Sequence, residues 1–311
     1  MIRRIILTLC LILSAMSYGQ TGHFFSSDRF SNSLIADLCQ DKFGNIWIAT
    51  DYGLNKFDGY QFESFLHDDR DTTTVCSNAI VELFTDSKGR LWVGTNRGLD
   101  RYCSDSNSFI HYPFPGNVLP RISDIIELSD GRILFCTAGY GTFVVGDDDV
   151  VRATSEFSPD PNDHFFSYAY VDSKNRFWKS GYDNSFLMKS DGEFKKFTST
   201  VGSPVGFIER SDEVLIICLH GIMSYSNGKM TVADIDMSEL RSTDALMSVA
   251  KMDNIGNVYI GTRGSGLYCI RSGERKLERV EVDAFGVNMS TAKVWAMLFD
   301  HHGNMWLGLQ R

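Results

Sequence analysis

Proline, positive charge and paired cysteines are all scarce in this chain of 311 residues. Only 6 prolines occur, against 27 glycines and 13% aromatic residues, and this favours many short strands joined by tight turns. The formal net charge of -9 leaves no basic face to replace the counterions of a polyanion, so we expect no nucleic-acid partner. No C-x-x-C pair is present, which argues against zinc knuckles and thioredoxin-type sites. We expect free thiols, mostly in buried strands, at Cys39, Cys76, Cys103, Cys136, Cys218 and Cys269.

The common motifs of catalysis and ion binding are missing as well. The sequence contains no P-loop, no dinucleotide fingerprint, no H-E-x-x-H and no G-x-S-x-G. The glycine-rich segment 263–266 lacks the strand-to-helix context of a phosphate site, and the acidic run 147–149 lacks the alternating carboxylates of a calcium loop. His301 and His302 are adjacent in a predicted turn, where their side chains point apart. We therefore expect no catalytic residues, no cofactor and no metal site.

The first twenty residues differ in composition from the rest. Arg3 and Arg4 precede an apolar run over 5–13, and small residues follow up to Gly19. This is the pattern of a signal peptide over residues 1–19, and a run of nine residues is too short to cross a hydrocarbon layer of about 30 Å. No later segment is long enough to do so. We predict cleavage after Gly19, export to the periplasm and a mature chain over 20–311.

A repeat of about 45 residues runs through the remaining chain. Residues 41–54 and 86–99 align without gaps, and the same frame returns at 253–262 and 300–308. Weaker copies lie at 131–137, 172–178 and 214–221. One large residue marks the same position of each copy, which gives seven units: Trp47, Trp92, Leu134, Trp178, Leu215, Tyr259 and Trp306.

Each unit predicts four short antiparallel strands. In the second unit these are 79–84, 91–93, 99–102 and 108–112. The first two strands are joined by an Asp-x-x-Gly turn, in which Asp bonds the local backbone and Gly adopts positive φ. Asn175 and Asn184 stand at glycine positions of the fourth unit, and Asn tolerates the left-handed region best after Gly.

Four strands per unit predict an all-β, seven-bladed β-propeller with four-stranded antiparallel blades. The last blade is expected to be incomplete, because the chain stops between its second and third strands. Residues 23–26 are expected to supply its outer strand. The blades are predicted around 32–65, 77–113, 121–150, 165–198, 205–232, 245–282 and 293–311.

The unit D-x-x-G-x-[IL]-W-[IV]-[GA]-T-x-x-G-L resembles the two-component regulator propeller repeat. The resemblance is closest over 32–41, 43–50 and 53–59 and extends to about 24–311; units three to five lack the Trp, the Thr or the turn Gly. It implies the periplasmic sensor of a Bacteroidetes-type hybrid two-component regulator, which responds to plant or host oligosaccharides. In that family, two propellers precede an immunoglobulin-like domain, a membrane helix, a histidine kinase, a receiver and a DNA-binding module. We interpret this chain as a truncated, non-enzymatic fragment that forms a homodimer in the full-length context.

The connections between second and third strands open on one face of a propeller, and they carry aromatic, amide and charged residues that form a plausible ligand rim. We expect a neutral or weakly charged oligosaccharide or another small polar ligand there, with tyrosines stacking on sugar rings and sulfated glycans disfavoured. Loop tips are also polar simply because they are solvated. A stand-alone secreted lyase using His220 and a structural dimerisation spacer are the alternative functions. The predicted ligand residues are Tyr52, Arg97, Tyr140, Tyr182, Asp183, His220 and Arg263.

Overall fold

Nearly all regular structure in the protein is β-strand. The computed structural model describes residues 9–14, 22–25, 29, 31–158, 168–181, 183–241, 243–281, 283–284 and 287–310. Its helical segments are α1 (Ser238–Arg241) and two 3-10 turns, η2 (Pro115–Asn117) and η3 (Met289–Thr291). Within these residues, no helix has the length and apolar character needed to span a membrane.

Six sheets each contain four antiparallel strands that follow one another in the sequence. The first consists of β3 (Ile35–Gln40), β4 (Ile46–Thr50), β5 (Gly53–Phe57) and β6 (Phe62–Phe65). The second consists of β7 (Ile80–Thr85), β8 (Leu91–Thr95), β9 (Gly98–Cys103) and β10 (Ser108–Tyr112). The third consists of β11 (Arg121–Glu127), β12 (Ile133–Ala138), β13 (Gly141–Val145) and β14 (Val151–Thr154).

The remaining three of these sheets have the same order. The fourth consists of β15 (Tyr168–Val171), β16 (Phe177–Ser180), β17 (Ser185–Ser190) and β18 (Glu193–Thr198). The fifth consists of β19 (Pro204–Arg210), β20 (Glu213–Cys218), β21 (Ile222–Ser226) and β22 (Lys229–Val232). The sixth consists of β23 (Met247–Met252), β24 (Val258–Thr262), β25 (Leu267–Ile270) and β26 (Leu277–Arg279).

A further four-stranded sheet joins the two ends of the described chain. β29 (Lys293–Phe299) pairs with β30 (Asn304–Gln310), β30 with β1 (Leu9–Ser14), and β1 with the outermost strand β2 (Gly22–Phe25). The predicted outer strand at 23–26 is therefore confirmed, shifted by one residue. The prediction that this last sheet is incomplete is wrong for the described chain, because β1 supplies the strand between β30 and β2. β1 comes from the segment assigned to the signal peptide, and that assignment stays a prediction. A short ribbon, β27 (Asp283–Ala284) with β28 (Val287–Asn288), precedes β29.

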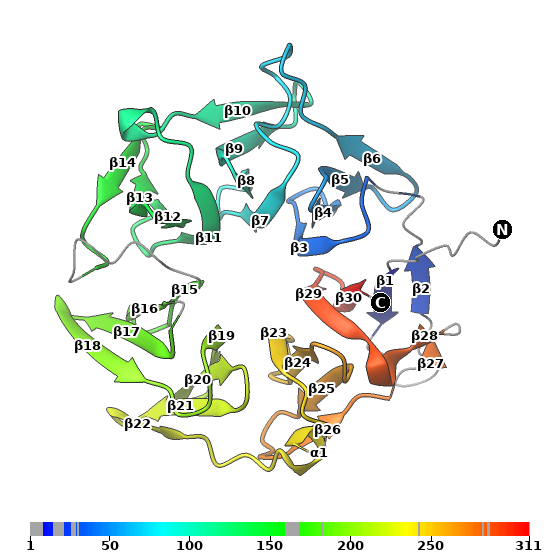
Figure 1. The fold of residues 1–311 in the computed structure, drawn as a ribbon, viewed down its shortest axis with the longest axis vertical. Helices are drawn as coiled ribbons and strands as arrows, with labels where there is room; N and C mark the ends of the chain where they lie inside the picture. The colour runs from blue at the N-terminus through cyan, green and yellow to red at the C-terminus, as the bar shows by residue number, and fades with distance from the viewer. Residues whose placement is uncertain are drawn as a thin grey trace.

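The sheets stand around a common axis, with their first strands innermost (Figure 1). Each first strand contacts the first strand of the next sheet, from β3 through β7, β11, β15, β19 and β23 to β29, and β29 contacts β3. The predicted all-β propeller with four-stranded antiparallel blades is thereby confirmed.

The aspartate of the Asp-x-x-Gly turn fixes both the turn and the tryptophan of its blade. In the first blade, Oδ1 of Asp41 accepts the backbone N–H of Phe43 at 2.9 Å and of Asn45 at 3.0 Å. Oδ2 accepts the indole N–H of Trp47 at 2.8 Å and the side-chain amide of Asn45. The same indole bond recurs at 2.8 to 3.0 Å in three other blades, from Trp92 to Asp86, Trp178 to Asp172 and Trp306 to Asp300.

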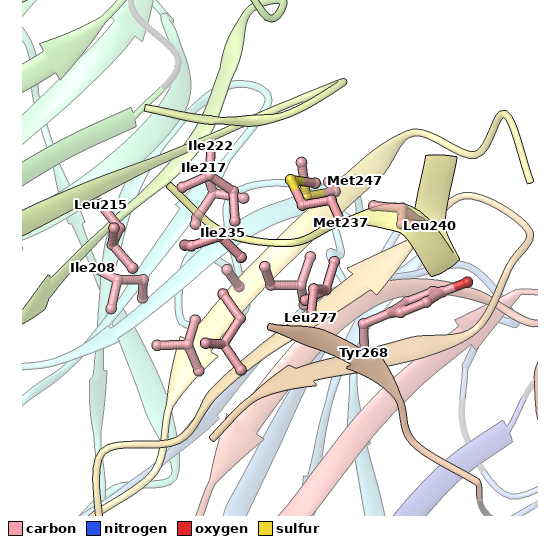
Figure 2. Packing of buried hydrophobic residues seen from close by; sticks show 14 of the residues in the cluster. Ile208, Leu215, Ile217, Ile222, Ile235, Met237, Leu240, Met247, Tyr268 and Leu277 are labelled. Carbon is pink, nitrogen blue, oxygen red and sulfur yellow. The ribbon is translucent and has the colours of Figure 1, made fainter. Parts of the chain in front are cut away.

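These tryptophans pack between neighbouring blades and are too buried to bind sugars. Trp47, Trp92 and Trp178 are fully buried. Trp47 lies in one apolar cluster with Ile80 and Leu83 of the second blade. The other blade interfaces are filled in the same way, with aliphatic residues where tryptophan is absent. Figure 2 shows the interface of the fifth and sixth blades, where Ile208 and Leu215 pack with residues of the sixth blade and its preceding connection.

The left-handed conformation was predicted for two asparagines and is confirmed for one of them only. Asn175 has a φ of 57°, as expected for a residue in the glycine position of the turn. Asn184 is not among the described residues with positive φ. Its carbonyl instead accepts the Ser199 N–H at 2.7 Å and its Oδ1 accepts the Ser203 hydroxyl at 3.0 Å. These bonds to the following connection replace the tight turn that a glycine would make.

The expected state of the cysteines agrees with the fold. The six that follow residue 20 are not joined in disulfides, with Cys136, Cys218 and Cys269 buried and the other three partly buried.

The indole bond is expected to be a measurable part of blade stability. Asp41→Ala removes two backbone bonds, the Asn45 bond and the Trp47 bond. Asp253→Ala is a matched control, because Asp253 makes the same turn bonds to Ile255 and Asn257 in a blade with Tyr259 instead of Trp. We expect Asp41→Ala to lower the free energy of unfolding by about 1–3 kcal/mol more than the control, since it strands a buried N–H. Equal losses in urea unfolding would contradict this.

Candidate functional site

A buried threonine at the end of the second strand builds the turn on which the predicted ligand residues stand. The Thr50 hydroxyl donates to the Gly53 carbonyl at 2.6 Å and accepts the Tyr52 N–H at 3.3 Å. Thr95 makes the same pair of bonds, to Gly98 at 3.0 Å and from Arg97 at 3.0 Å. The threonine bond to the turn glycine also recurs in the third and sixth blades. The side chains at the tip are thus held outward, away from the blade core.

The predicted ligand residues occupy these tips but are not joined to one another. Tyr52 is 53% exposed and Tyr140 is 48% exposed. Asp183 is occupied locally, because its carboxylate accepts the N–H and hydroxyl of Ser185 at 3.0 and 2.6 Å. Tyr182 lies outside the described residues. Among the described members, including the exposed Arg97, His220 and Arg263, no hydrogen bond, ion pair or ring contact links two of them.

The first strands surround a cavity of about 1240 Å³ along the ring axis. Of the described predicted residues, Arg263 alone lines it. Its guanidinium lies 5.1 Å from the ring centre of Trp295, which is 37% exposed and donates its indole N–H to Gln310 at 2.9 Å. Arg121 and Tyr168, at the starts of β11 and β15, line the same end of the cavity. These four residues, Arg121, Tyr168, Arg263 and Trp295, are called the channel mouth below.

Three acidic side chains line the cavity on adjacent first strands. Asp37, Glu82 and Asp124 occupy equivalent positions, each just after a bulge in the pairing of the first two strands. Asp37 accepts the Leu83 N–H of the next blade at 2.9 Å, and Asp124 accepts the Ala169 N–H of the next blade. These three are called the acidic trio.

Burial raises the pKa of every member of the acidic trio, and neighbouring acidic charges add to the rise for Glu82 and Asp124. Burial raises the pKa of Asp124 to about 7 and also raises the pKa of Asp37. Burial and then the charges of Asp37 and Asp124 raise the pKa of Glu82 well above its usual value, against the attraction of Lys251. The interaction between the two side chains lowers the pKa of Asp37 and raises the pKa of Glu82, so we assign the strongest proton binding of the trio to Glu82. The trio therefore lines the cavity with carboxyl groups that bind protons more strongly than exposed ones do.

Sequence reasoning missed the acidic trio and Trp295. The signal for the trio was present: each acid stands four residues before the turn position, at Asp41, Asp86 and Leu128. Side chains alternate along a strand, so this position faces the axis in every unit. Trp295 occupies the bulge position of its first strand, where the first three units have Ala36, Val81 and Ser123, so the repeat gave no sign of an aromatic residue there.

The other ion-site patterns of the sequence have structural roles. The His301 N–H donates to the Gln40 side chain at 2.7 Å and the His302 N–H donates to Asp300 at 2.9 Å, so both are turn residues. Segment 147–149 forms the tip of the β13–β14 hairpin, where Asp147 accepts from Lys88 at 2.7 Å. Within the described chain, the histidines in ion pairs are His67 and His111, so no carboxylate partners His220 in the way a general base requires.

The fold and the cavity define the class of this protein, which is a β-propeller with a polar axial cavity. Residues 29–52 and 74–97 match the family model of the two component regulator propeller, so the chain carries repeats of that family, as the resemblance predicted. A curated relative, Histidine kinase P4 of Formosa agariphila, is 40% identical over 52 residues, which are 17% of this chain and 4% of that protein.

Solved structures share the fold. The extracellular domain of BT3049 from B. thetaiotaomicron, assigned to the hybrid two component systems, is 18% identical with a TM-score of 0.76, covering 96% of this chain and 40% of that one. Virginiamycin B lyase from Staphylococcus aureus is 15% identical with a TM-score of 0.68, covering 89% of this chain and 94% of that one. At these identities the likenesses concern the fold, and the chain spans well under two thirds of the sensor domain's length.

The raised pKa values of the acidic trio predict a pH-dependent stability. A carboxyl whose folded pKa exceeds its unfolded value stabilises the fold fully below the unfolded pKa, and this contribution is lost as pH rises through the folded pKa. For Asp124 that window runs from the ordinary 3.8 to about 7. We expect the melting temperature to fall between about pH 4 and pH 7, and Glu82→Gln to reduce that fall.

The control for this prediction is Glu278→Gln, because Glu278 pairs with Lys276 at 2.8 Å outside the cavity. It should leave the slope between the two pH values unchanged. Parallel melting curves for the parent and Glu82→Gln would contradict the assignment of the proton to Glu82.

Proposed function

We propose that this protein is the extracytoplasmic sensor propeller of a hybrid two-component signalling protein and that it binds an oligosaccharide in its axial cavity. The observation that carries the proposal is the cavity itself, which combines the exposed indole of Trp295 with cationic, phenolic and carboxyl groups. Sugar rings present apolar faces to aromatic side chains and hydroxyls to such polar groups. The two-component propeller repeats at 29–52 and 74–97 support the signalling context.

The charge pattern favours a neutral or weakly charged ligand. Arg121 and Arg263 stand at the channel mouth, while the acidic trio lies deeper on the first strands. A glycan whose hydroxyls accept from the guanidinium groups and bridge the carboxyls satisfies both. The formal net charge of -9 repels polyanionic glycans. The tips carrying Tyr52 and Tyr140 are proposed to extend the contact for longer chains.

The ligand proposal is tested by paired substitutions. We expect Trp295→Ala and Glu82→Gln each to weaken binding of a neutral oligosaccharide at least about tenfold, because both remove groups from the proposed site. Tyr52→Ala, at an exposed tip outside the cavity, should weaken it less. The measurement is calorimetric titration with an oligosaccharide first selected by thermal shift from a neutral glycan panel.

Two outcomes of that titration would count against the cavity. If Tyr52→Ala abolishes binding while Trp295→Ala does not, the ligand lies on the tips. If mass spectrometry shows the glycan cleaved or eliminated during the titration, the protein is an enzyme of the lyase type.

We further propose that the ring has seven blades, with the mixed sheet of β29, β30, β1 and β2 as the last. In support, β29 contacts both β23 and β3. We also propose that residues 1–19 are a signal peptide. Its cleavage on export would remove β1, and a different strand would then fill the position between β30 and β2. In the full-length context we propose a homodimer.

Export is tested directly. Expressed in a Gram-negative host, the protein should be recovered from the periplasm with Gln20 as its first residue. N-terminal sequencing of the periplasmic and cytoplasmic fractions measures this. A full-length cytoplasmic product that keeps Met1 would contradict it, without bearing on the ligand site.

A further inference from the structure

A cluster of three potential metal ligands lies in the second blade, away from the axial cavity. Cys76 belongs to the connection between β6 and β7, Asp100 to β9 and His111 to β10. Their ligand atoms all lie within 4.8 Å of one another. No spacing in the sequence announced this cluster, because each ligand comes from a different segment of the blade.

The buried carboxylate of Asp100 organises the cluster. Asp100 is fully buried and accepts the Cys76 N–H at 2.7 Å through Oδ2. Its Oδ1 bonds Nδ1 of His111 at 2.7 Å. The Cys76 thiol lies 3.2 Å from the hydroxyl of Thr95, the threonine that builds the turn of this blade.

The first blade has the same arrangement made of neutral residues. Asn55 accepts the Ser31 N–H at 2.9 Å and the Ser64 hydroxyl at 2.6 Å, and Ser31 Oγ lies 3.3 Å from Thr50 Oγ1. Asn55 and Ser64 are directly paired across their strands, as Asp100 and His111 are. The fold therefore needs only small polar groups at these three positions.

In the second blade all three positions hold residues that ligate metals. Cys76 stands where Ser31 stands, Asp100 where Asn55 stands, and His111 where Ser64 stands. Serine and asparagine already make these hydrogen bonds in the first blade. Hydrogen bonding therefore does not explain why a thiol, a carboxylate and an imidazole occur together in the second blade. A thiolate, an imidazole and a carboxylate together form a typical zinc ligand set.

We propose that Cys76, Asp100 and His111 bind a divalent cation of the zinc type, leaving one coordination position open. Metal–ligand bonds of about 2.0–2.3 Å place the ligand atoms of a tetrahedral site about 3.3–3.6 Å apart. Side-chain rotations that move these atoms by about an ångström therefore suffice to form the site. The thiol releases its proton to solvent, and the imidazole turns Nδ1 from Asp100 to the metal. Thiolate and carboxylate then balance the two positive charges, which compensates the buried charge of Asp100.

The site is open to solvent on one side. The His111 side chain is 37% exposed, and Cys76 is partly buried. An ion can therefore enter without opening the blade, and a water molecule or a ligand group can fill the fourth position, as at metal sites with three protein ligands.

The test is a Co²⁺ titration of the reduced full-length protein, followed by competition with Zn²⁺. We expect saturation at one equivalent, with a thiolate-to-cobalt charge-transfer band and intense visible bands of a tetrahedral site. Cys76→Ser should abolish the charge-transfer band and weaken binding more than about tenfold. Cys103→Ser is the matched control, since Cys103 is a free, partly buried thiol of the same blade, and it should change neither.

A triple variant separates metal binding from folding. Cys76→Ser, Asp100→Asn and His111→Ser together reproduce the neutral set of the first blade, so the protein should fold. Zn²⁺ should raise the melting temperature of the parent and leave that of the triple variant unchanged. Absence of saturable Co²⁺ binding in the parent, or an unchanged cobalt spectrum in Cys76→Ser, overturns the proposal.

Discussion

The bond between the turn aspartate and the indole N–H is the constraint on which each tryptophan-containing blade depends. One carboxylate closes the hairpin and fixes the ring that packs on the next blade, as Asp41 does for Trp47. A buried N–H without an acceptor would be strongly destabilising. Accordingly, the third and fifth blades, which have Leu128 and Arg210 at the aspartate position, carry leucine instead of tryptophan. These two blades therefore lack both the indole donor and the aspartate acceptor.

The same repetition that builds the ring also builds its axis. A bulge in the first strand of each of the first three blades is followed by a side chain that lines the cavity, and in all three that side chain is acidic. Asp37 and Asp124 also bond the backbone of the next blade, so they join blades and line the cavity at once. Keeping three carboxyls close together raises their pKa values, most strongly that of Glu82, and this links ring stability to pH.

Much of the fold was readable from the sequence, because turn chemistry and strand patterning repeat. The strands of the second unit and the left-handed Asn175 follow from local rules. Asn184 did not, since its bonds to Ser199 and Ser203 come from the following connection. The site was harder to predict, because the sequence assigns residues to loops but does not give their distance from the ring axis. Arg263 reaches the cavity while Tyr52, on an equivalent turn, does not.

A repeat scaffold separates the residues that fold a blade from those that give it a function. The threonine, the turn glycine and the strand pairing are shared by the first two blades, and so is the hydrogen-bond pattern beside them. Within that fixed pattern the first blade carries Asn55 with two serines, and the second carries Asp100 with a thiol and an imidazole. Because the neutral version already satisfies every bond, the second blade's chemistry is not required for folding. Comparison between blades of one chain therefore indicates which polar clusters are structural and which are available to bind a ligand.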